Sequence, residues 1–268
     1  MLGSSLRYEQ PQEQAQRVAP YLIINAGWIN IFAMKLPITR YGLPQVVVLP
    51  AIIVAVMLIA GSSLFVVHSL RTNNYLLTTI LAIEVVLAIV LIFILSFFRD
   101  PARIPPADKN ILLSPADGTI ADIEVVDEKE FIKGKALRIG IFLSIFNVHI
   151  NRSPCDVKIE KIIYKKGDFK DARDPSAGSF NESNDLFLIR KQAPFDKLMV
   201  RQISGAIARR IVCKAEVGAE LAGGQKFGMI KFGSRTELYV PANEAVKCSV
   251  KIGDKVKAGL TTLVKYKR

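Results

Sequence analysis

Four short segments of this chain carry side chains whose types and spacing could support catalysis. They are SPADGT at 114–119 with Asp117, FNVHINRSP at 146–154 with His149 and Arg152, RQISGAIARR at 201–210 with Arg201, Arg209 and Arg210, and IKFGSR at 230–235 with Gly233 and Ser234. His149 is the histidine available for acid–base chemistry, because the other histidine, His68, lies within an apolar run. Clustered guanidinium groups suit a phosphate, because arginine keeps its charge and presents several donors in one plane.

Each of these segments also has a structural interpretation. Asp-Gly and Gly-Ser are frequent in turns. A lone histidine on a strand is often a hydrogen-bonded core residue, and a group of arginines is often a solvated face. The sequence contains no Walker loop and no dinucleotide fingerprint, so a glycine-rich phosphate cradle is not expected. Only the four segments together point to a specific chemistry.

The composition excludes several classes of protein. The 268 residues carry a formal net charge of +12, 50% of them are hydrophobic, and the mean hydropathy is +0.29. This hydrophobicity excludes a chain that is disordered throughout. Cys155, Cys213 and Cys248 form no CxxC pair, and with only 2 histidines they exclude a zinc ribbon, an iron–sulfur cluster and a disulfide scaffold. We therefore expect reduced thiols, no metal and a catalytic part on the cytoplasmic side.

Two long apolar runs predict a membrane anchor. Residues 41–70 contain no Lys, Arg, Asp or Glu, and residues 72–98 contain only Glu84. Because about 20 apolar residues span a bilayer, we expect transmembrane helices at about 43–70 and 75–98, joined as a hairpin. A carboxylate such as Glu84 is costly in lipid, so it either has a function or pairs with a neighbouring helix.

The basic residues around the hairpin predict its orientation. Lys35 and Arg40 precede it, Arg99, Arg103 and Lys109 follow it, and Arg71 lies at its tip. The positive-inside rule therefore places both ends in the cytoplasm. A shorter apolar stretch at 21–34 is more typical of an interfacial helix than of a spanning one. We expect residues 1–98 to anchor the chain in the cell membrane and residues 99–268 to form a cytoplasmic domain.

The sequence after the hairpin predicts a mainly β domain. The run RIGIFLSIFNVHI at 138–150 alternates in hydrophobicity, as half-buried strands do. Pro and Gly recur at short intervals, as in DPSAGS at 174–179 and KIGDKVKAG at 251–259. This favours short strands in a sandwich or barrel-sandwich-like domain with few short helices. One short helix is expected at 205–211.

The four segments, together with FFRDP at 97–101 and the pair Asn181–Glu182, resemble the short form of phosphatidylserine decarboxylase. That group includes archaetidylserine decarboxylases. The resemblance implies a pyruvoyl enzyme whose proenzyme cuts itself between Gly233 and Ser234, leaving a β chain of residues 1–233 and an α chain of residues 234–268. In these roles Ser234 would attack the Gly233 carbonyl, His149 would act as the base, and Asp117 would orient the imidazole.

The implied reaction is the loss of CO2 from a serine-headgroup phospholipid, either phosphatidylserine or archaetidylserine. The substrate amine would form a Schiff base with a pyruvoyl group made from Ser234, which would take up the electrons left by CO2. The resemblance implies no metal, no pyridoxal phosphate and no nucleic acid. The expected partners are the lipid, the membrane, the two chains of one precursor and further copies in a homo-oligomer. The candidate residues for the lipid phosphate are Arg152, Arg201, Arg209 and Arg210.

Two alternatives stay open. Longer bacterial and mitochondrial relatives carry His-x-x-His, and their first histidine falls on Phe146 here, so His149 alone would serve both self-cleavage and protonation. The stretch at 217–259 also resembles the barrel-sandwich pattern of biotinyl and lipoyl carriers, which would make the chain a membrane-anchored adaptor, although the carrier lysine is absent. A nucleic-acid-binding protein is disfavoured, because the chain has 1 Trp and no aromatic–basic repeat.

Overall fold

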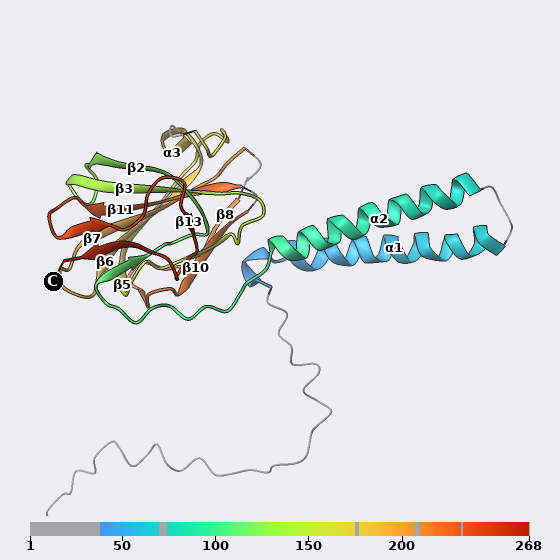
Figure 1. The fold of residues 1–268 in the computed structure, drawn as a ribbon, viewed down its shortest axis with the longest axis horizontal. Coiled ribbons are helices and arrows are strands. Elements are labelled where there is room, and N and C mark those ends of the chain that lie inside the picture. Colours follow the sequence, from blue (N-terminus) through green and yellow to red (C-terminus); the bar gives the residue numbers. More distant parts are fainter. Residues whose placement is uncertain (1–37, 70–73, 175–176, 207–209, 232, 268) are drawn as a thin grey trace, which may run out of the picture. The chain divides into compact units, whose positions relative to one another are not determined.

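The computed structural model describes residues 38–267 apart from 70–73, 175–176, 207–209 and 232 (Figure 1). The chain divides into two units, Met1–Leu36 and Pro37–Arg268. The first unit, and with it the helix expected at 21–34, lies outside the described residues. Every element described below belongs to the second unit.

Two long helices form the hairpin that the composition predicts. α1 (Gln45–Ser69) and α2 (Asn74–Phe97) lie side by side in Figure 1. Within them, Gln45–Phe65 and Tyr75–Phe97 are long and apolar enough to cross a membrane. Few of their side chains are buried, whereas a core helix of a soluble protein would bury most of its apolar surface. The predicted N-terminal helical hairpin is confirmed, and its exposed apolar surface fits a lipid environment.

The described chain after the hairpin is mainly β structure, as predicted. A 3-10 turn at Arg40–Gly42 precedes α1, and the one helix described after residue 98 is α3 (Ala177–Phe180). The described strands are β1 (Ile111–Leu113), β2 (Gly118–Glu128), β3 (Gly134–Leu143), β4 (Ile150–Arg152), β5 (Val157–Lys165), β6 (Ser183–Arg190), β7 (Lys197–Ile203), β8 (Arg210–Cys213), β9 (Glu220–Leu221), β10 (Lys226–Lys231), β11 (Ser234–Pro241), β12 (Val246–Cys248), β13 (Lys255–Val256) and β14 (Thr262–Tyr266).

One local expectation is wrong. Residues 205–211 were expected to be helical, but Arg210 and Ile211 belong to β8, which pairs with β10 through Lys231↔Arg210 and Ile230↔Ile211. Ile211 and Val212 suit a strand, because β-branched residues pack well on a pleated sheet. Tertiary pairing with β10 therefore decides the conformation at this position.

Antiparallel pairing places β11 in the middle of the largest sheet. This eight-stranded sheet has the order β13-β2-β3-β11-β7-β6-β5-β9, and two three-stranded sheets have the orders β1-β14-β12 and β4-β10-β8. At its first residue β11 pairs with β3 through Ser234↔Leu143, and one residue later it pairs with β7 through Arg235↔Ile203. The segment that carries Ser234 is thus fixed on both sides by backbone hydrogen bonds.

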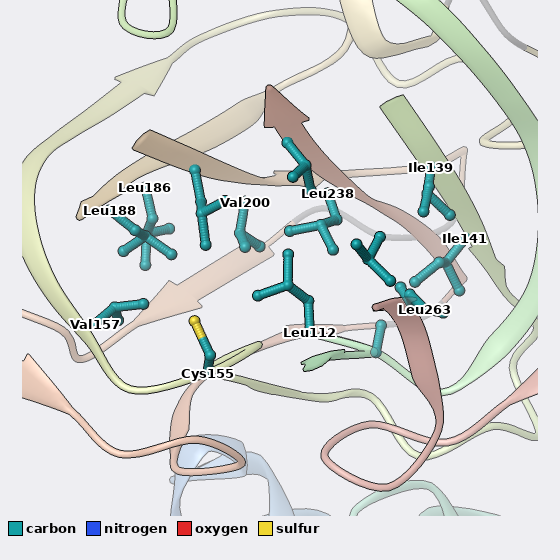
Figure 2. Packing of buried hydrophobic residues seen from close by; sticks show 14 of the residues in the cluster. Leu112, Ile139, Ile141, Cys155, Val157, Leu186, Leu188, Val200, Leu238 and Leu263 are labelled. Atoms are coloured by element: carbon teal, nitrogen blue, oxygen red, sulfur yellow. The ribbon is translucent and has the colours of Figure 1, made fainter. Parts of the chain in front are cut away.

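The core explains why these strands form. Residues Ile139, Ile141 and Leu143 alternate along β3 and are fully buried. Figure 2 shows Ile139 and Ile141 in one cluster with aliphatic side chains of other strands, including Leu238 of β11 and Val200 of β7. Each side chain of this size contributes roughly 1.5–3 kcal/mol when it leaves water. The alternation recognised in the sequence is therefore the core face of the strand next to Ser234.

A separate apolar cluster joins the base of the hairpin to the β domain. It contains Val46 of α1, Ile94 and Phe97 of α2, Phe98, and Met229 of β10. Phe97 is 1% exposed and Phe98 is 0% exposed, unlike most of the hairpin. The end of the second helix is therefore part of the packed protein interior.

Candidate active site

The expected cleavage site lies between two strands that belong to different sheets. β10 ends at Lys231 and β11 begins at Ser234, so the chain crosses from one sheet to the other over two residues. Gly233 has a φ of 67°, in the left-handed region that glycine adopts without a steric penalty. Ser234 is fully buried, and within the described structure its hydroxyl oxygen Oγ has no hydrogen-bond partner. A buried hydroxyl without a partner is unusual and indicates a functional position.

His149 lies directly beside this peptide. It is fully buried in the segment between β3 and β4. Its Nδ1 is 2.9 Å from the carbonyl oxygen of Asn147, and the amide N–H of Gly233 donates to its Nε2 at 3.2 Å. Because a carbonyl oxygen only accepts, Nδ1 carries the ring hydrogen, and Nε2 presents its lone pair toward the Gly233–Ser234 backbone.

The environment of His149 keeps its imidazole neutral. Burial is the main cause, and it lowers the pKa of His149 from 6.5 to about 4. The positive charge of Arg99 lowers this pKa further, whereas the hydrogen bond to Asn147 and the charge of Asp117 act in the opposite direction. A neutral imidazole whose Nε2 carries no proton can act as a base near neutral pH.

Asp117 lies close enough to influence His149, but its hydrogen bonds go elsewhere. Its two carboxylate oxygens accept from the guanidinium of Arg103 at 2.5 and 2.8 Å, and Oδ1 also accepts from the amide of Ala258 at 2.8 Å. The position at Nδ1 of His149 that an orienting carboxylate would take is held by the Asn147 carbonyl. In the described structure Asp117 therefore acts on His149 through its charge rather than through a hydrogen bond.

The candidate phosphate-binding arginines occupy different environments. Arg201 donates to both carboxylate oxygens of the buried Asp185, at 2.6 and 2.9 Å. Arg152 is 6% exposed and donates to the carbonyls of Gly224 and Pro101. Arg209 lies outside the described residues, and Arg210 is exposed on β8.

A cavity opens next to the cleavage site. It measures about 410 Å³, and Gly233 forms part of its wall together with Ile145, Ala172 and Gly205. Asp171 and Arg173 also line it. The cavity leaves open space beside the backbone of Gly233. Among the described residues, no group of three or more His, Cys, Asp or Glu could hold a metal ion.

Comparison with known proteins decides between the enzyme and its alternatives. A family model described as phosphatidylserine decarboxylase matches residues 90–264. The chain belongs to this family. It is 46% identical over 171 residues to the phosphatidylserine decarboxylase proenzyme of Desulfotalea psychrophila, which covers 64% of this chain and 78% of that protein. It is 42% identical over 176 residues to the proenzyme of Carboxydothermus hydrogenoformans, which covers 66% of this chain and 81% of that protein.

A third relative extends the similarity into the hairpin. The phosphatidylserine decarboxylase proenzyme of Rhodopirellula baltica is 37% identical over 234 residues, which covers 87% of this chain and 90% of that protein. The resemblance recognised in the sequence is thus confirmed. Because the relatives are decarboxylase proenzymes, the barrel-sandwich pattern at 217–259 does not require a carrier-like adaptor to explain it.

Four residues that the structure places at or beside the candidate site are not identified by sequence reasoning. They are Phe97, which contacts the His149 ring, Arg103, which holds Asp117, Gly205, which lies against Gly233, and Lys231, which pairs across the strands with Arg210. Phe97, Gly205 and Lys231 do lie inside quoted motifs, namely FFRDP, RQISGAIARRIV and IKFGSR. The motifs therefore mark the right segments, but a sequence does not show which side chain of a motif faces the reacting peptide.

Proposed function

We propose that this chain is a membrane-anchored, self-processing decarboxylase of a serine-headgroup phospholipid. The observation that carries the proposal is the contact between Nε2 of His149 and the amide of Gly233, next to the buried, unpartnered hydroxyl of Ser234. A neutral base, a nucleophile and a flexible glycine peptide are the groups that a serine-dependent self-cleavage requires.

The proposed maturation begins with the Ser234 hydroxyl. His149 accepts the hydroxyl proton at Nε2 while Oγ attacks the Gly233 carbonyl carbon, and the peptide C–N bond breaks to leave an ester and a free amine on Ser234. Removal of the Ser234 α-proton then breaks the ester C–O bond, which releases Gly233 as a carboxylate and leaves a carbon–carbon double bond on residue 234. Addition of water releases ammonia and leaves a pyruvoyl group at the start of residues 234–268.

The pyruvoyl group, once formed, supplies the carbonyl that binds the substrate amine and the electron sink for loss of CO2. The chain's own contribution is to hold residue 234 in place after the cut. β11 stays paired with β3 and β7, β13 with β2, and β14 with β1. We therefore expect the two chains to remain one folded unit, with the new N-terminus fixed beside His149 and the 410 Å³ cavity.

A buried charge network reinforces this attachment. Arg235 and Glu237, both fully buried on β11, bond to each other at 2.8 Å, and Arg235 also donates to Asp122 of β2 at 2.6 Å. Tyr239 donates to the other Glu237 oxygen at 2.6 Å. Charges buried in this way are stable only when they are paired, so separating β11 from β2 would expose a costly set of unpaired groups.

The substrate phosphate is proposed to meet Arg210 and Lys231. These residues are cross-strand partners at the end of β10 that leads into the cleavage site. Within the described structure neither forms a salt bridge with a carboxylate, and Lys231 donates instead to the side-chain oxygen of Gln45 at 3.0 Å, at the first turn of α1. Arg201 and Arg152 are less suitable, because their charges are already paired with the carboxylates of Asp185 and Asp100.

This arrangement fits a lipid substrate that stays in the membrane. Each CH2 moved from the bilayer into water costs about 0.8 kcal/mol, so the headgroup has to be met at the membrane surface. Gln45 begins the apolar helix, so the Lys231–Gln45 contact connects the cleavage segment to the base of the hairpin. The basic residues at that base favour a cytoplasmic domain, and phosphatidylserine and archaetidylserine share the headgroup that would be recognised.

Mass spectrometry of the purified full-length protein tests the proposal. We expect residues 1–233 and 234–268 as separate chains, the shorter one with a pyruvoyl N-terminus, and release of CO2 from phosphatidylserine in mixed micelles. Ser234→Ala should give one intact, inactive chain, because the nucleophile and the pyruvoyl carbons are lost together. Ser249→Ala, at an exposed serine of the same C-terminal segment, is the matched control and should mature normally. An intact wild-type chain would contradict the proposal, and parallel assays of ester and ether lipids would define the substrate tail.

A further inference from the structure

The last residue of the membrane hairpin touches the proposed base. The ring of Phe97, at the end of α2, lies against the imidazole of His149, with the ring centroids 4.4 Å apart and the planes tilted by 35°. Both rings are almost completely buried. Two contacts therefore hold the imidazole: the Phe97 ring packs against it, and the Gly233 amide donates to its Nε2 atom.

Both helices of the hairpin fix the position of Phe97. Val46 of α1 and Ile94 of α2 belong to the same buried cluster as Phe97 and Phe98, and Met229 of β10 completes it. A backbone hydrogen bond also connects the two ends of the hairpin, because the amide of Thr39, which precedes α1, donates to the carbonyl of Phe98 at 2.9 Å. The position of Phe97 is thus fixed by α1, by α2 and by the residues that precede and follow the hairpin.

Arg99, two residues after Phe97, connects the base of the hairpin to the segment that carries His149. Its guanidinium donates to the carbonyl of Phe146 at 2.6 Å, three residues before His149. Phe146 itself packs edge-on against Phe93 of α2, with ring centroids 6.4 Å apart. The hairpin therefore contacts the 146–149 segment at two points besides the imidazole ring.

We propose that Phe97 is a positioning residue for His149, so that the base of the membrane hairpin forms one wall of the active site and self-cleavage requires it to be docked. The proposal rests on the proposed function, because it takes His149 as the base. Stacking restricts the ring to the orientation in which Nε2 faces Gly233, and the phenyl ring keeps water away from the imidazole. The hairpin then has a catalytic consequence in addition to holding the protein on the membrane.

Removing the ring should change how His149 titrates. The charged groups that act on His149 are Arg99, which follows α2, and Asp117, which precedes β2 and is neutralised by Arg103. Burial is the largest influence on its pKa. Phe97→Ala leaves both charges in place but admits water, so the pKa of His149 should rise from about 4 toward the ordinary value of 6.5.

The titration can be measured without any cleavage. The chain has 2 histidines, so a full-length protein carrying Ser234→Ala and His68→Gln gives a single imidazole signal in the NMR spectrum of histidine-labelled protein in micelles. We expect the midpoint of this signal to rise by at least one pH unit in Phe97→Ala. It should return close to the starting value in Phe97→Leu, whose apolar side chain still excludes water. Phe65→Ala, which removes an exposed ring from α1, is the control and should leave the midpoint unchanged.

The rate of self-cleavage provides the second readout. Full-length precursor with Ser234 intact is made in a cell-free system with lipid nanodiscs and transferred to buffers between pH 5 and pH 8. Phe97→Ala should cleave at least tenfold more slowly than wild type at pH 5, with a smaller deficit at pH 8. Phe97→Leu and Phe65→Ala should follow the wild-type pH profile.

Two results would overturn the role of Phe97. One is an unchanged His149 midpoint in Phe97→Ala together with a wild-type pH profile. The other is loss of cleavage at every pH in both Phe97→Ala and Phe97→Leu, because that would show a contact needed only for folding. A wild-type chain that never cleaves would instead refute the proposed function, and the NMR midpoints would still decide whether the phenyl ring controls the imidazole.

Discussion

Gly205 has no room for a side chain beside the carbonyl oxygen of Gly233. A methyl group added at Gly205 would lie 2.6 Å from that oxygen and 3.1 Å from the Cβ of Ala172. Atoms in proteins do not approach this closely without displacement, and the oxygen belongs to the backbone, so a flexible side chain cannot relieve the contact. The carbonyl that the Ser234 hydroxyl is proposed to attack is therefore positioned partly by the absence of a side chain at residue 205.

Gly205→Ala should accordingly slow self-cleavage by at least tenfold. The methyl group pushes the Gly233 carbonyl away from its present position, and displacements of about 1 Å at a reacting group can cost a factor of about 100 in rate. The fraction of cleaved chain, followed by mass spectrometry over time, measures the effect. Gly134→Ala is the control, because a Cβ there meets nothing within 4 Å. Equal cleavage rates in the two variants would show that the Gly233 carbonyl need not be held by residue 205.

The pairing of Asp117 with Arg103 leads to a second prediction. The side chains are 10% and 6% exposed, so removing either partner leaves the other charge buried and destabilises the fold by about 3–5 kcal/mol. We expect Asp117→Asn and Arg103→Gln to slow cleavage to a similar degree and to lower the melting temperature together. Lys109→Gln breaks a more exposed pair with Asp156 and should cost less than about 1 kcal/mol.

The comparison also separates two roles for Asp117. If the carboxylate serves mainly to attach the linker after α2 to Ala258, both partners matter equally, because Arg103 donates to the Ala258 carbonyl and Asp117 accepts from the Ala258 amide. If Asp117 instead orients His149 directly during cleavage, Asp117→Asn should stop the reaction while Arg103→Gln leaves it nearly unchanged. Processing rates of the two variants distinguish these roles.

The hairpin and the β domain could be predicted from the sequence because each depends on local composition. Thirty consecutive residues without Lys, Arg, Asp or Glu, from 41 to 70 and mostly apolar, permit little except a membrane helix or a buried one. The alternation at Ile139, Ile141 and Leu143 likewise has one simple explanation, which is a strand with one buried face. His149 was identifiable because the other histidine, His68, lies in an apolar run, and Ser234 was identifiable only because IKFGSR and the other segments together resemble the family.

The partners of individual side chains could not be predicted in the same way. Arg201 was a reasonable candidate for a phosphate, but it lies directly across from Asp185 in the β6–β7 register, and that register is not visible in the sequence. The contact of Phe97 with His149 joins residues far apart in the chain, and both phenylalanines of FFRDP read as the end of a lipid-facing helix. Pairings of this kind depend on tertiary packing rather than on local pattern.

The proposed phosphate site gives a third prediction. Arg210→Gln should raise the KM for phosphatidylserine in mixed micelles by at least about tenfold, because a hydrogen bond from a charged donor contributes roughly 1.5–3 kcal/mol. The kcat and the yield of residues 234–268 should change little, because Arg210 is exposed whereas His149 and Ser234 are fully buried. Lys214→Gln, an exposed cation just after β8, is the control. An unchanged KM in Arg210→Gln would remove this residue from substrate binding.

The buried imidazole predicts how stability depends on pH. Burial lowers the pKa of His149 to about 4 in the folded protein, whereas the unfolded chain titrates near 6.5. Between these values the unfolded state binds the proton and the folded state does not, so the free energy of unfolding falls as the pH drops from about 6.5 to about 4. The difference corresponds to about 3 kcal/mol at 1.36 kcal/mol per pKa unit.

His149→Gln removes this contribution, because glutamine does not titrate. In a Ser234→Ala background, where no cleavage complicates unfolding, guanidinium titrations in detergent at pH 7 and pH 4 should show a smaller loss of stability for His149→Gln than for the parent. The expected difference between the two losses is about 3 kcal/mol. Every carboxylate that protonates over this range is present in both proteins, so its effect cancels in the comparison. Equal losses would mean that the imidazole is hydrated in the folded state, and a hydrated imidazole would not have the neutral, water-shielded lone pair that the proposed self-cleavage uses.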